Sequence, residues 1–300
     1  MNNKKTLSVD QLEDRRLMTV TAMEIGEDLY INGDGSSDMI QVYQLSNGDV
    51  RIAGIAGSGT TVNGQSQAQF EVNDDIYIDL GNGDNWLDIR NNNGGVDADY
   101  VRIRSGNGND RLWVSGINTT NDLRFETRGG NDDILVAGSQ IGNGSGDDLR
   151  VYSGSGEDTV RVQMTNVRQD IDIDTFDSTS TANEEDEVNI QSTNAHDDIW
   201  IDTGSGNDDV FLRDVESGDD TRIRTGAGND YVFVNAVSKF GDDFSAYMGS
   251  GNDTLGVYQT DIGDDARFDA GTGLNDRLYT WQLDVNGQTT EVGWDAITRY

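Results

Sequence analysis

Two neighbouring stretches, Gly204-Ser205-Gly206-Asn207-Asp208 and Gly226-Ala227-Gly228-Asn229-Asp230, carry one five-residue motif at a separation of 22 residues. The motif returns along most of the chain. The aspartates that end it, or that stand in its place, lie at positions 110, 132, 158, 186, 208, 230, 253 and 276. A nearly constant period of this length is the signature of a repeat architecture.

Each period contains two short alternating segments. Ile199 and Ile201 precede one copy of the motif, and Val210 and Leu212 follow it. Such alternation indicates strands that bury one face. Because one repeat cannot bury its apolar face alone, the pattern predicts an all-β fold, a parallel β-solenoid with coils of about 22 residues and two short strands per coil. A β-sandwich or propeller is the alternative, but it requires antiparallel hairpins, and a propeller blade has a period of about 40 residues.

The repeat also predicts the domain organisation. We expect an N-terminal leader over residues 1–22, degenerate first coils and a cap over 23–74, regular coils over 75–280 and a C-terminal cap over 281–300. Asn286-Gly287, between apolar residues, predicts a closing hairpin in the last segment. The chain has no proline, which suits strands whose backbone is hydrogen-bonded on both sides. It has no cysteine, which excludes disulfides and thiolate sites.

The charge is strongly acidic. With 55 Asp and Glu against 21 Lys and Arg, the net charge is −34. Such a surface repels nucleic acids and anionic membranes and attracts divalent cations. No stretch is apolar enough to predict a transmembrane segment.

The leader carries Gln11-Leu12-Glu13-Asp14-Arg15-Arg16-Leu17-Met18 in place of the apolar run of a signal peptide. This string resembles the N-terminal signature of extracellular proteins of planctomycete bacteria. The resemblance implies an extracellular or cell-surface location. The alternative is an ordinary charged leader or capping helix.

The motif also predicts a column of acidic turns. Carboxylates stacked one coil apart, about 4.8 Å, repel one another by about 1 kcal/mol per pair in water, so the column needs neutralisation. Carboxylate, amide and backbone oxygens in this number suit Ca²⁺. The alternative is a turn ladder in which Asn and Asp side chains accept hydrogen bonds from backbone amides without a metal.

Thr203 to Phe211 resembles the RTX (haemolysin-type) calcium-binding repeat Gly-Gly-x-Gly-x-Asp-x-apolar-x, although Thr203 stands in place of its first glycine. The resemblance implies that several Ca²⁺ ions bind at this edge of the solenoid. The candidate ligands are the motif residues Asp110, Asp132, Asp158, Asp208, Asp230, Asp253, Asp276, Asn109, Asn131, Asn207, Asn229 and Asn252.

A second acidic turn, of the form Gly-Asp-Asp in several coils, lies on the other side of each repeat. It predicts a second candidate metal edge, made of Asp122, Asp148, Asp170, Asp198, Asp220, Asp243 and Asp265. We call the two sides the glycine edge and the Asp-Asp edge.

Two outward faces complete the coil. One carries a stripe that includes Trp113, Phe211, Phe233 and Tyr258, a candidate contact face for extracellular glycans or other copies of the chain. The other alternates arginines with carboxylates, which predicts a ladder of surface ion pairs or a second contact face.

We therefore expect a calcium-stabilised structural or adhesive repeat protein. The alternative is a carbohydrate-binding or carbohydrate-active protein, such as a lyase or hydrolase. Every coil repeats its carboxylates, so no pair is singled out as a catalytic acid and base, and we expect no enzyme activity.

Overall fold

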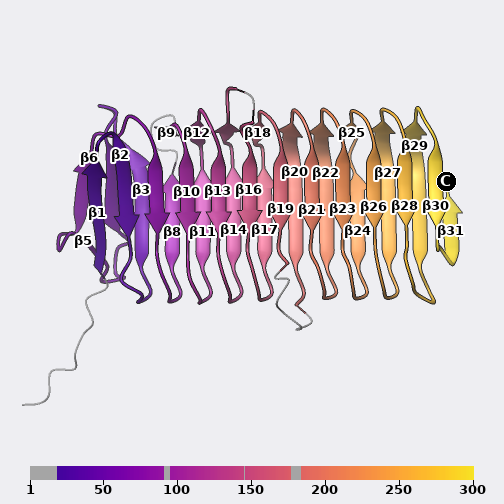
Figure 1. The fold of residues 1–300 in the computed structure, drawn as a ribbon, viewed down its shortest axis with the longest axis horizontal. Helices are drawn as coiled ribbons and strands as arrows, with labels where there is room; N and C mark the ends of the chain where they lie inside the picture. Colours follow the sequence, from indigo (N-terminus) through magenta and orange to yellow (C-terminus); the bar gives the residue numbers. More distant parts are fainter. Residues whose placement is uncertain (1–18, 91–94, 145, 177–183) are drawn as a thin grey trace, which may run out of the picture.

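The structure is a computed structural model that describes residues 19–90, 95–144, 146–176 and 184–300. These residues form an all-β fold without helices, a parallel β-solenoid of about nine turns, as the repeat predicts (Figure 1). Successive coils lie about 23 residues apart. The rod therefore grows by one coil for each copy of the motif.

One coil shows how the chain is wound. Strand β21 (Ile199–Asp202) leads into the glycine-edge turn, β22 (Asp209–Ser217) follows on the opposite side, and the Asp-Asp turn leads to β23 (Thr221–Arg224). β21 pairs in parallel with β23, and Ile201 lies beside Ile223. The motif residues therefore stack in columns along the rod.

Two sheets form the long sides of the solenoid. The first sheet has 13 strands. In order they are β30 (Thr289–Val292), β28 (Ala266–Asp269), β26 (Phe244–Tyr247), β23, β21, β19 (Ile171–Asp174), β16 (Leu149–Tyr152), β13 (Leu123–Glu126), β10 (Val101–Arg104), β7 (Ile76–Asp79), β2 (Asp28–Asn32), β1 (Thr19–Ile25) and β5 (Thr61–Val62).

The second sheet has 18 strands. In chain order they are β3 (Met39–Gln44), β4 (Val50–Gly54), β6 (Gln67–Phe70), β8 (Trp86–Arg90), β9 (Val96–Ala98), β11 (Arg111–Ser115), β12 (Ile117–Thr119), β14 (Asp133–Ala137), β15 (Gln140–Ile141), β17 (Thr159–Gln163), β18 (Asn166–Val167), β20 (Glu187–Ala195), β22, β24 (Tyr231–Asn235), β25 (Ser238–Phe240), β27 (Thr254–Ile262), β29 (Arg277–Val285) and β31 (Ala296–Arg299).

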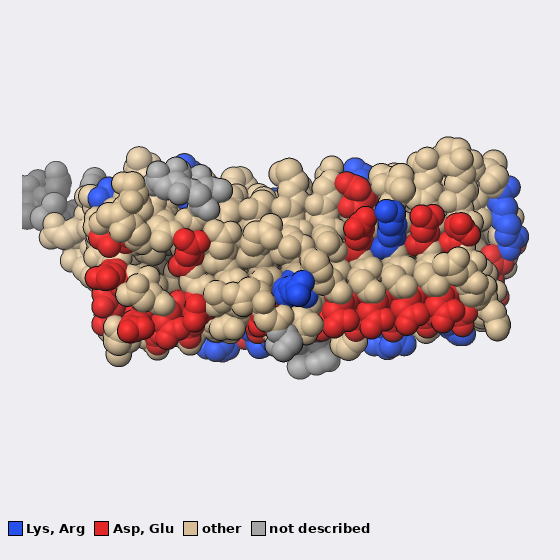
Figure 2. Space-filling model, turned by 90° about the horizontal axis from the view of Figure 1, so that it is seen from above, with Lys and Arg blue, Asp and Glu red and all other residues tan. Residues whose placement is uncertain are grey.

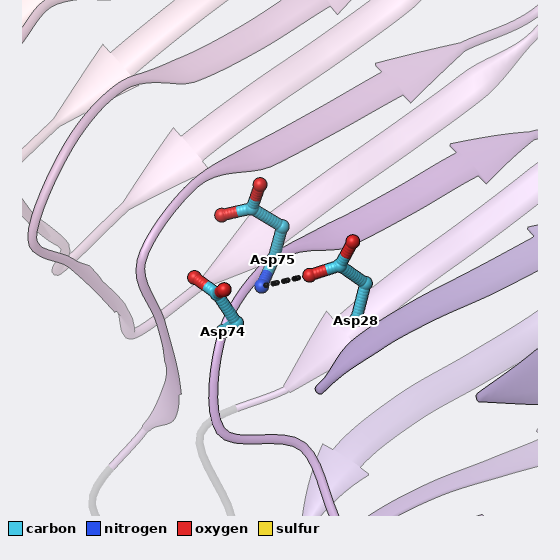
Figure 3. Close-up of side chains that lie close together, drawn as sticks. All are labelled: Asp28, Asp74 and Asp75. Carbon is cyan, nitrogen blue, oxygen red and sulfur yellow. Dashed lines mark hydrogen bonds between the residues drawn. The ribbon is translucent and has the colours of Figure 1, made fainter. Parts of the chain in front are cut away.

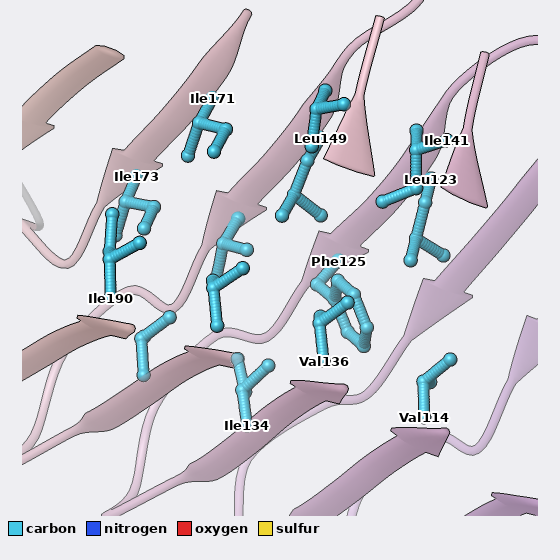
Figure 4. Close-up of a cluster of buried hydrophobic side chains, with 14 of the residues drawn as sticks. Val114, Leu123, Phe125, Ile134, Val136, Ile141, Leu149, Ile171, Ile173 and Ile190 are labelled. Carbon is cyan, nitrogen blue, oxygen red and sulfur yellow. The ribbon is translucent and has the colours of Figure 1, made fainter. Parts of the chain in front are cut away.

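The core lies between the two sheets. Figure 4 shows Leu123 and Phe125 of the first sheet facing Ile134 and Val136 of the second. All four side chains have no exposed surface. Each fully buried side chain of this size stabilises the fold by about 1.5 to 3 kcal/mol relative to an exposed one. Stacking thus supplies the burial that a single coil lacks.

The second sheet bends at a corner that the sequence pattern does not predict. The residue after β11 is Gly116, with a φ of 63°, and the equivalent residue in later coils includes Met164 at 49° and Asp214 at 55°. A left-handed backbone at one residue turns the strand, and a short third segment such as β12 follows. Non-glycine residues adopt this conformation at some cost in free energy.

Close contact between coils explains the glycines of the motif. A Cβ atom on Gly228 would lie 1.4 Å from the carbonyl oxygen of Gly206 in the preceding coil. No side chain fits at Gly228, so this close approach requires glycine there. The position is not glycine in every coil, because Glu184 occupies it and its amide donates to the carbonyl of Ser205 in the next coil.

The N-terminal end is capped by antiparallel strands. β1 pairs with β2, and β4 pairs with β3 and β6, all antiparallel. Val20 and Ala22 of β1 are buried. Residues 19–22, which the sequence assigns to a leader, therefore lie in β1. The string from Gln11 to Met18 lies outside the described residues.

The C-terminal end corrects one prediction. Asn286-Gly287 does not close a hairpin, because β30 pairs in parallel with β28 and β31 pairs in parallel with β29. The amide of Gly287 donates to the carbonyl of Asp264, as an Asp-Asp-edge turn does. Residues 281–300 therefore continue the repeat instead of leaving it.

Candidate metal centre

The glycine edge holds its aspartates inside the solenoid. All seven predicted aspartates of this edge are at most 2% exposed. Asp110 donates its backbone amide to Oδ1 of Asp132 at 2.8 Å, and Asp132 donates in turn to Asp158 at 2.8 Å. The same bond continues through Asp186 and Asp208 up to Asp276. We call this set the buried aspartate column.

The second oxygen of each carboxylate has a more varied environment. In Asp186 and Asp208, Oδ2 accepts a hydroxyl hydrogen bond at 2.7 Å, from Thr175 and Thr203 respectively. In Asp253 and Asp276, Oδ2 is buried and has no hydrogen-bond partner among the described residues. An ionised carboxylate in this position is expensive, because burial removes its hydration.

The pKa values follow from this burial. Burial raises the pKa of Asp132 and of Asp186 to about 8, and that of Asp230 to about 7. Hydrogen bonds from backbone amides oppose the rise but do not cancel it. Burial therefore favours the protonated form of these three carboxyls.

The predicted asparagines of the glycine edge form a second, exposed ladder. Oδ1 of Asn109 accepts the amide of Asn131, Oδ1 of Asn207 accepts that of Asn229, and Oδ1 of Asn229 accepts that of Asn252. These side-chain oxygens already accept hydrogen bonds from backbone amides. The glycine edge thus has the hydrogen-bonded ladder that the sequence left open as an alternative to metal binding.

The Asp-Asp edge has carboxylates that converge. Three overlapping triads bring one oxygen of each member within 4.8 Å of the others. The triads are Asp197–Asp198–Asp219, Asp219–Asp220–Asp242 and Asp242–Asp243–Asp264. Figure 2 shows a continuous row of acidic side chains over the C-terminal half of this edge. We call these residues the acidic row.

Hydrogen bonds orient the inner members of the acidic row. Oδ1 of Asp198 accepts the amide of Asp220, and Oδ1 of Asp220 accepts the amide of Asp243. These bonds run from each coil back to the preceding one, opposite to those of the buried column. The outer members Asp219, Asp242 and Asp264 are exposed.

Crowding and burial also raise pKa values within the acidic row. Burial and neighbouring carboxylates raise the pKa of Asp198 to about 6. The charge of Asp265, followed by desolvation and by the charges of Asp242 and Asp243, raises the pKa of the exposed Asp264. Their negative charges therefore favour a bound cation.

The donor set fits Ca²⁺. Two oxygens that bind one Ca²⁺ at about 2.3 to 2.6 Å lie at most about 5 Å apart, so the oxygens of each triad are able to share an ion. Ca²⁺ takes six to eight oxygens, and solvent completes the shell at an exposed site. The acidic row is the better candidate metal centre of the two edges.

The other predicted residues of the Asp-Asp edge are placed differently. Arg150 forms ion pairs with Asp122, at 2.9 Å, and with Asp148. Asp170 and Asp265 accept the amides of Asp198 and Gln288 and belong to no triad. Among the residues that the structure describes, Asp198, Asp220 and Asp243 are the members of the predicted set that lie within triads.

A further triad lies near the N-terminal end, where Asp28, Asp74 and Asp75 converge (Figure 3). The amide of Asp75 donates to Oδ1 of Asp28 at 3.4 Å. The hydroxyls of Tyr30 and Tyr77 donate to Asp28 and Asp75. These hydroxyls already occupy two of the carboxylates, so this triad offers fewer unused oxygens than the acidic row.

The sequence prediction missed the outer residues Asp197, Asp219, Asp242 and Asp264. They are the first aspartates of Asp-Asp pairs whose second members were predicted. The repeated pair was the available signal. It shows that two carboxylate columns, one outer and one inner, stack at this edge.

The predicted contact face is divided. Phe233 lies 5.2 Å from Tyr258 and 6.1 Å from Tyr231, and Tyr231 lies 5.9 Å from Phe211, all between ring centroids. Trp113 instead packs against Trp86 at 6.2 Å, with the Arg111 guanidinium over both rings. The structure therefore groups three of the four predicted aromatics and places Trp113 in a separate pair.

The described residues contain no helix long and apolar enough to cross a membrane. No protein-family model, no curated protein and no solved structure matches the chain.

Proposed function

We propose that the chain is a structural and adhesive rod, located at the cell surface or outside the cell, whose acidic row binds Ca²⁺. The observation that carries the proposal is the convergence of carboxylate oxygens in three overlapping triads. The triads link four successive coils. A cation bound in each one ties neighbouring coils together.

The location rests on the N-terminal signature and on the expected affinity. Open, partly hydrated calcium sites in extracellular modules bind with a Kd of about 10⁻⁴ to 10⁻³ M. The exposed triads belong to this class. They would fill where Ca²⁺ is millimolar, as it is outside cells.

The proposal assigns no catalytic role. The ions bind at the Asp-Asp edge in this proposal, whereas the resemblance to RTX repeats implies binding at the glycine edge. The glycine-edge aspartates have one oxygen committed to a backbone amide and are closed to solvent. They supply hydrogen bonds between coils in this proposal.

Chelation tests the proposal. The melting temperature, followed by circular dichroism near pH 7.5, is measured in EDTA and then in excess CaCl₂, with MgCl₂ at the same concentration as the control for ionic strength. An ion present at about ten times its Kd stabilises the fold by about 1.4 kcal/mol per site. We expect Ca²⁺ to raise the melting temperature by several degrees and Mg²⁺ to raise it less, because Mg²⁺ demands a stricter geometry. Equal effects of the two ions, or no effect of either, would contradict the proposal.

A further inference from the structure

The outer face of the first sheet carries one exposed tryptophan among charged residues. Trp200 of β21 is 53% exposed. In the register of the sheet it lies between Asp172 of β19 and Arg222 of β23. The next outward column places Asp202 between Asp174 and Arg224. These residues surround a shallow hollow of about 220 Å³.

The charges around Trp200 are less fully paired than those elsewhere on this face. Glu126 binds Arg102 and Arg104 at 2.7 Å. Around Trp200, the distance between Arg224 and Asp202 is 4.0 Å, the limit for an ion pair. Arg222 has no ion pair within 4.0 Å among the described residues.

The indole is also uncovered, unlike neighbouring aromatic rings. Arg222 and Arg267 lie over the ring of Tyr247, at 5.1 and 5.5 Å from its centroid. Arg124 lies over Tyr152 at 5.0 Å. No guanidinium covers Trp200 in the described part of the chain, although Arg222 and Arg224 line the same hollow. The hollow therefore offers an uncovered aromatic face beside Arg222 and Arg224, and beside Asp172, whose Oδ2 accepts the hydroxyl of Tyr152 at 2.8 Å.

The carboxylates of the hollow retain acceptor capacity. One oxygen of Asp174 accepts the amide of Phe176 at 2.9 Å, which leaves its other oxygen for a ligand. Burial raises the pKa of Asp174 and of Asp202. Hydroxyl donors relieve such partly buried carboxylates by hydrogen bonding.

We propose that this hollow, the Trp200 site, binds one ring of a neutral saccharide. The C–H face of a pyranose is apolar and weakly positive, so it stacks on the negative face of the indole. The hydroxyl rim donates to the aspartates and accepts from Arg222 and Arg224. Three carboxylates against two guanidinia disfavour an acidic sugar.

The size of the hollow supports a single ring. Sites that enclose a drug-sized ligand measure about 300 to 1,000 Å³, and this hollow is smaller. It also lies on an open sheet face, so a longer glycan is able to extend across the neighbouring coils. The site goes beyond the proposed calcium function, because none of its contacts requires an ion.

Binding measurements on a matched pair of variants test the site. Cellohexaose, mannohexaose and laminarihexaose serve as probes, and binding is followed by titration calorimetry and by tryptophan fluorescence. Trp200→Ala removes the stacking surface. Trp281→Ala is the control, because Trp281 is 40% exposed and lies on β29 of the other sheet. Both side chains are exposed, so both variants should melt like the parent chain.

We expect at least one hexasaccharide to bind, Trp200→Ala to weaken it at least about tenfold, and Trp281→Ala to leave it unchanged. Arg222→Gln should also weaken binding, with at most a small change in melting temperature from the loss of its contact with Tyr247. Failure of all three probes to bind, or equal binding to Trp200→Ala, would overturn the proposal. The titrations are run in EDTA and in CaCl₂, so loss of the calcium function leaves this result interpretable.

Discussion

The two edges of the solenoid use the same side chain in opposite ways. At the glycine edge, Asp230 points inward, is 2% exposed and accepts the amide of Asp208. At the Asp-Asp edge, Asp242 is exposed and lies within two triads of carboxylates. The comparison shows that a column of aspartates is a hydrogen-bonded ladder when the backbone closes over it and a candidate cation site when it faces solvent.

The difference extends to how each edge is neutralised. At the glycine edge, burial favours the protonated form of Asp132 and Asp186, whose pKa it raises to about 8. The acidic row has water on one side and is accessible to ions. Changes in pH should therefore act mainly on the first edge, and changes in Ca²⁺ mainly on the second.

The largest expected effect is that of pH on the buried column. The pKa of these aspartates is higher in the folded chain than the ordinary value of 3.8, so protonation stabilises the fold. This stabilisation is complete below about pH 4 and is lost as the pH rises through about 6 to 8. A tenfold difference in proton affinity between the folded and unfolded chain corresponds to about 1.4 kcal/mol of stability. In EDTA, the melting temperature should therefore fall between pH 5 and pH 9.

High salt sharpens this test. At about 1 M salt the screening length is about 3 Å, so repulsion within the exposed acidic row is suppressed while the buried column is affected much less. The fall in melting temperature should persist in high salt. A profile that becomes flat in salt would assign the effect to the acidic row instead.

The next effect is that of replacing one buried carboxyl by an amide. Asn85 extends the buried column by one coil, because its amide donates to Oδ1 of Asp110 at 2.8 Å. Its Oδ1 accepts the amide of Asp38 at 2.8 Å, and its Nδ2 donates to the carbonyls of Gly81 and Gly83. Asp132→Asn should adopt the same bonds without burying a charge. We expect it to stabilise the fold by roughly 1 to 3 kcal/mol at pH 8 and much less at pH 5.

Asp84→Asn is the matched control for this substitution. Asp84 is exposed at the glycine edge, and its Oδ1 accepts the amide of Asn109 as the asparagine ladder does. Urea unfolding should show little change for this variant at either pH. Destabilisation by Asp132→Asn at pH 8 would contradict this expectation, because it would show that the ionised Asp132 stabilises the fold.

The smallest effect concerns repulsion at the Asp-Asp edge. Asp264 lies beside Asp265 and Asp242, whose charges raise its pKa. In EDTA at low salt, Asp264→Asn should raise the melting temperature slightly, and the gain should vanish in high salt. A gain that survives high salt would mean that its origin is not this exposed repulsion.

Much of the fold could be predicted from the sequence. The alternation of Leu112 and Val114 in one segment and of Leu123 and Phe125 in a later segment of the same coil predicts two facing sheets, and all four residues are buried. A period near 22 residues predicts the parallel stacking, because equivalent residues fall into columns. These features repeat in every coil, so each copy strengthens the same prediction.

The orientation of the aspartates could not be predicted from the period. A column such as Asp208 and Asp230 has the same spacing whether its side chains point inward or outward. The buried Thr203 and Thr225 that precede the motif, together with Asn85 in the place of an aspartate, are consistent with the inward orientation. The resemblance to a calcium repeat implies the outward orientation instead.

Two local features also escaped the sequence pattern. The left-handed corner is occupied by Gly116, Met164 and Asp214 among others, so no residue type marks it. Asn286-Gly287 has the composition of a hairpin turn, but its backbone bonds to the preceding coil. In both cases stacking on the neighbouring coil decides the conformation.

The most direct test of the difference between the edges is calcium titration of two variants. Asp219→Asn/Asp242→Asn removes carboxylates from all three triads, and Asp230→Asn changes one residue of the buried column. Calorimetry and the Ca²⁺-dependent rise in melting temperature are measured for both variants and the parent chain. We expect the double variant to lose most of the calcium response and Asp230→Asn to keep it. The opposite result, with the response lost in Asp230→Asn and kept in the double variant, would place the ions at the glycine edge and contradict this account.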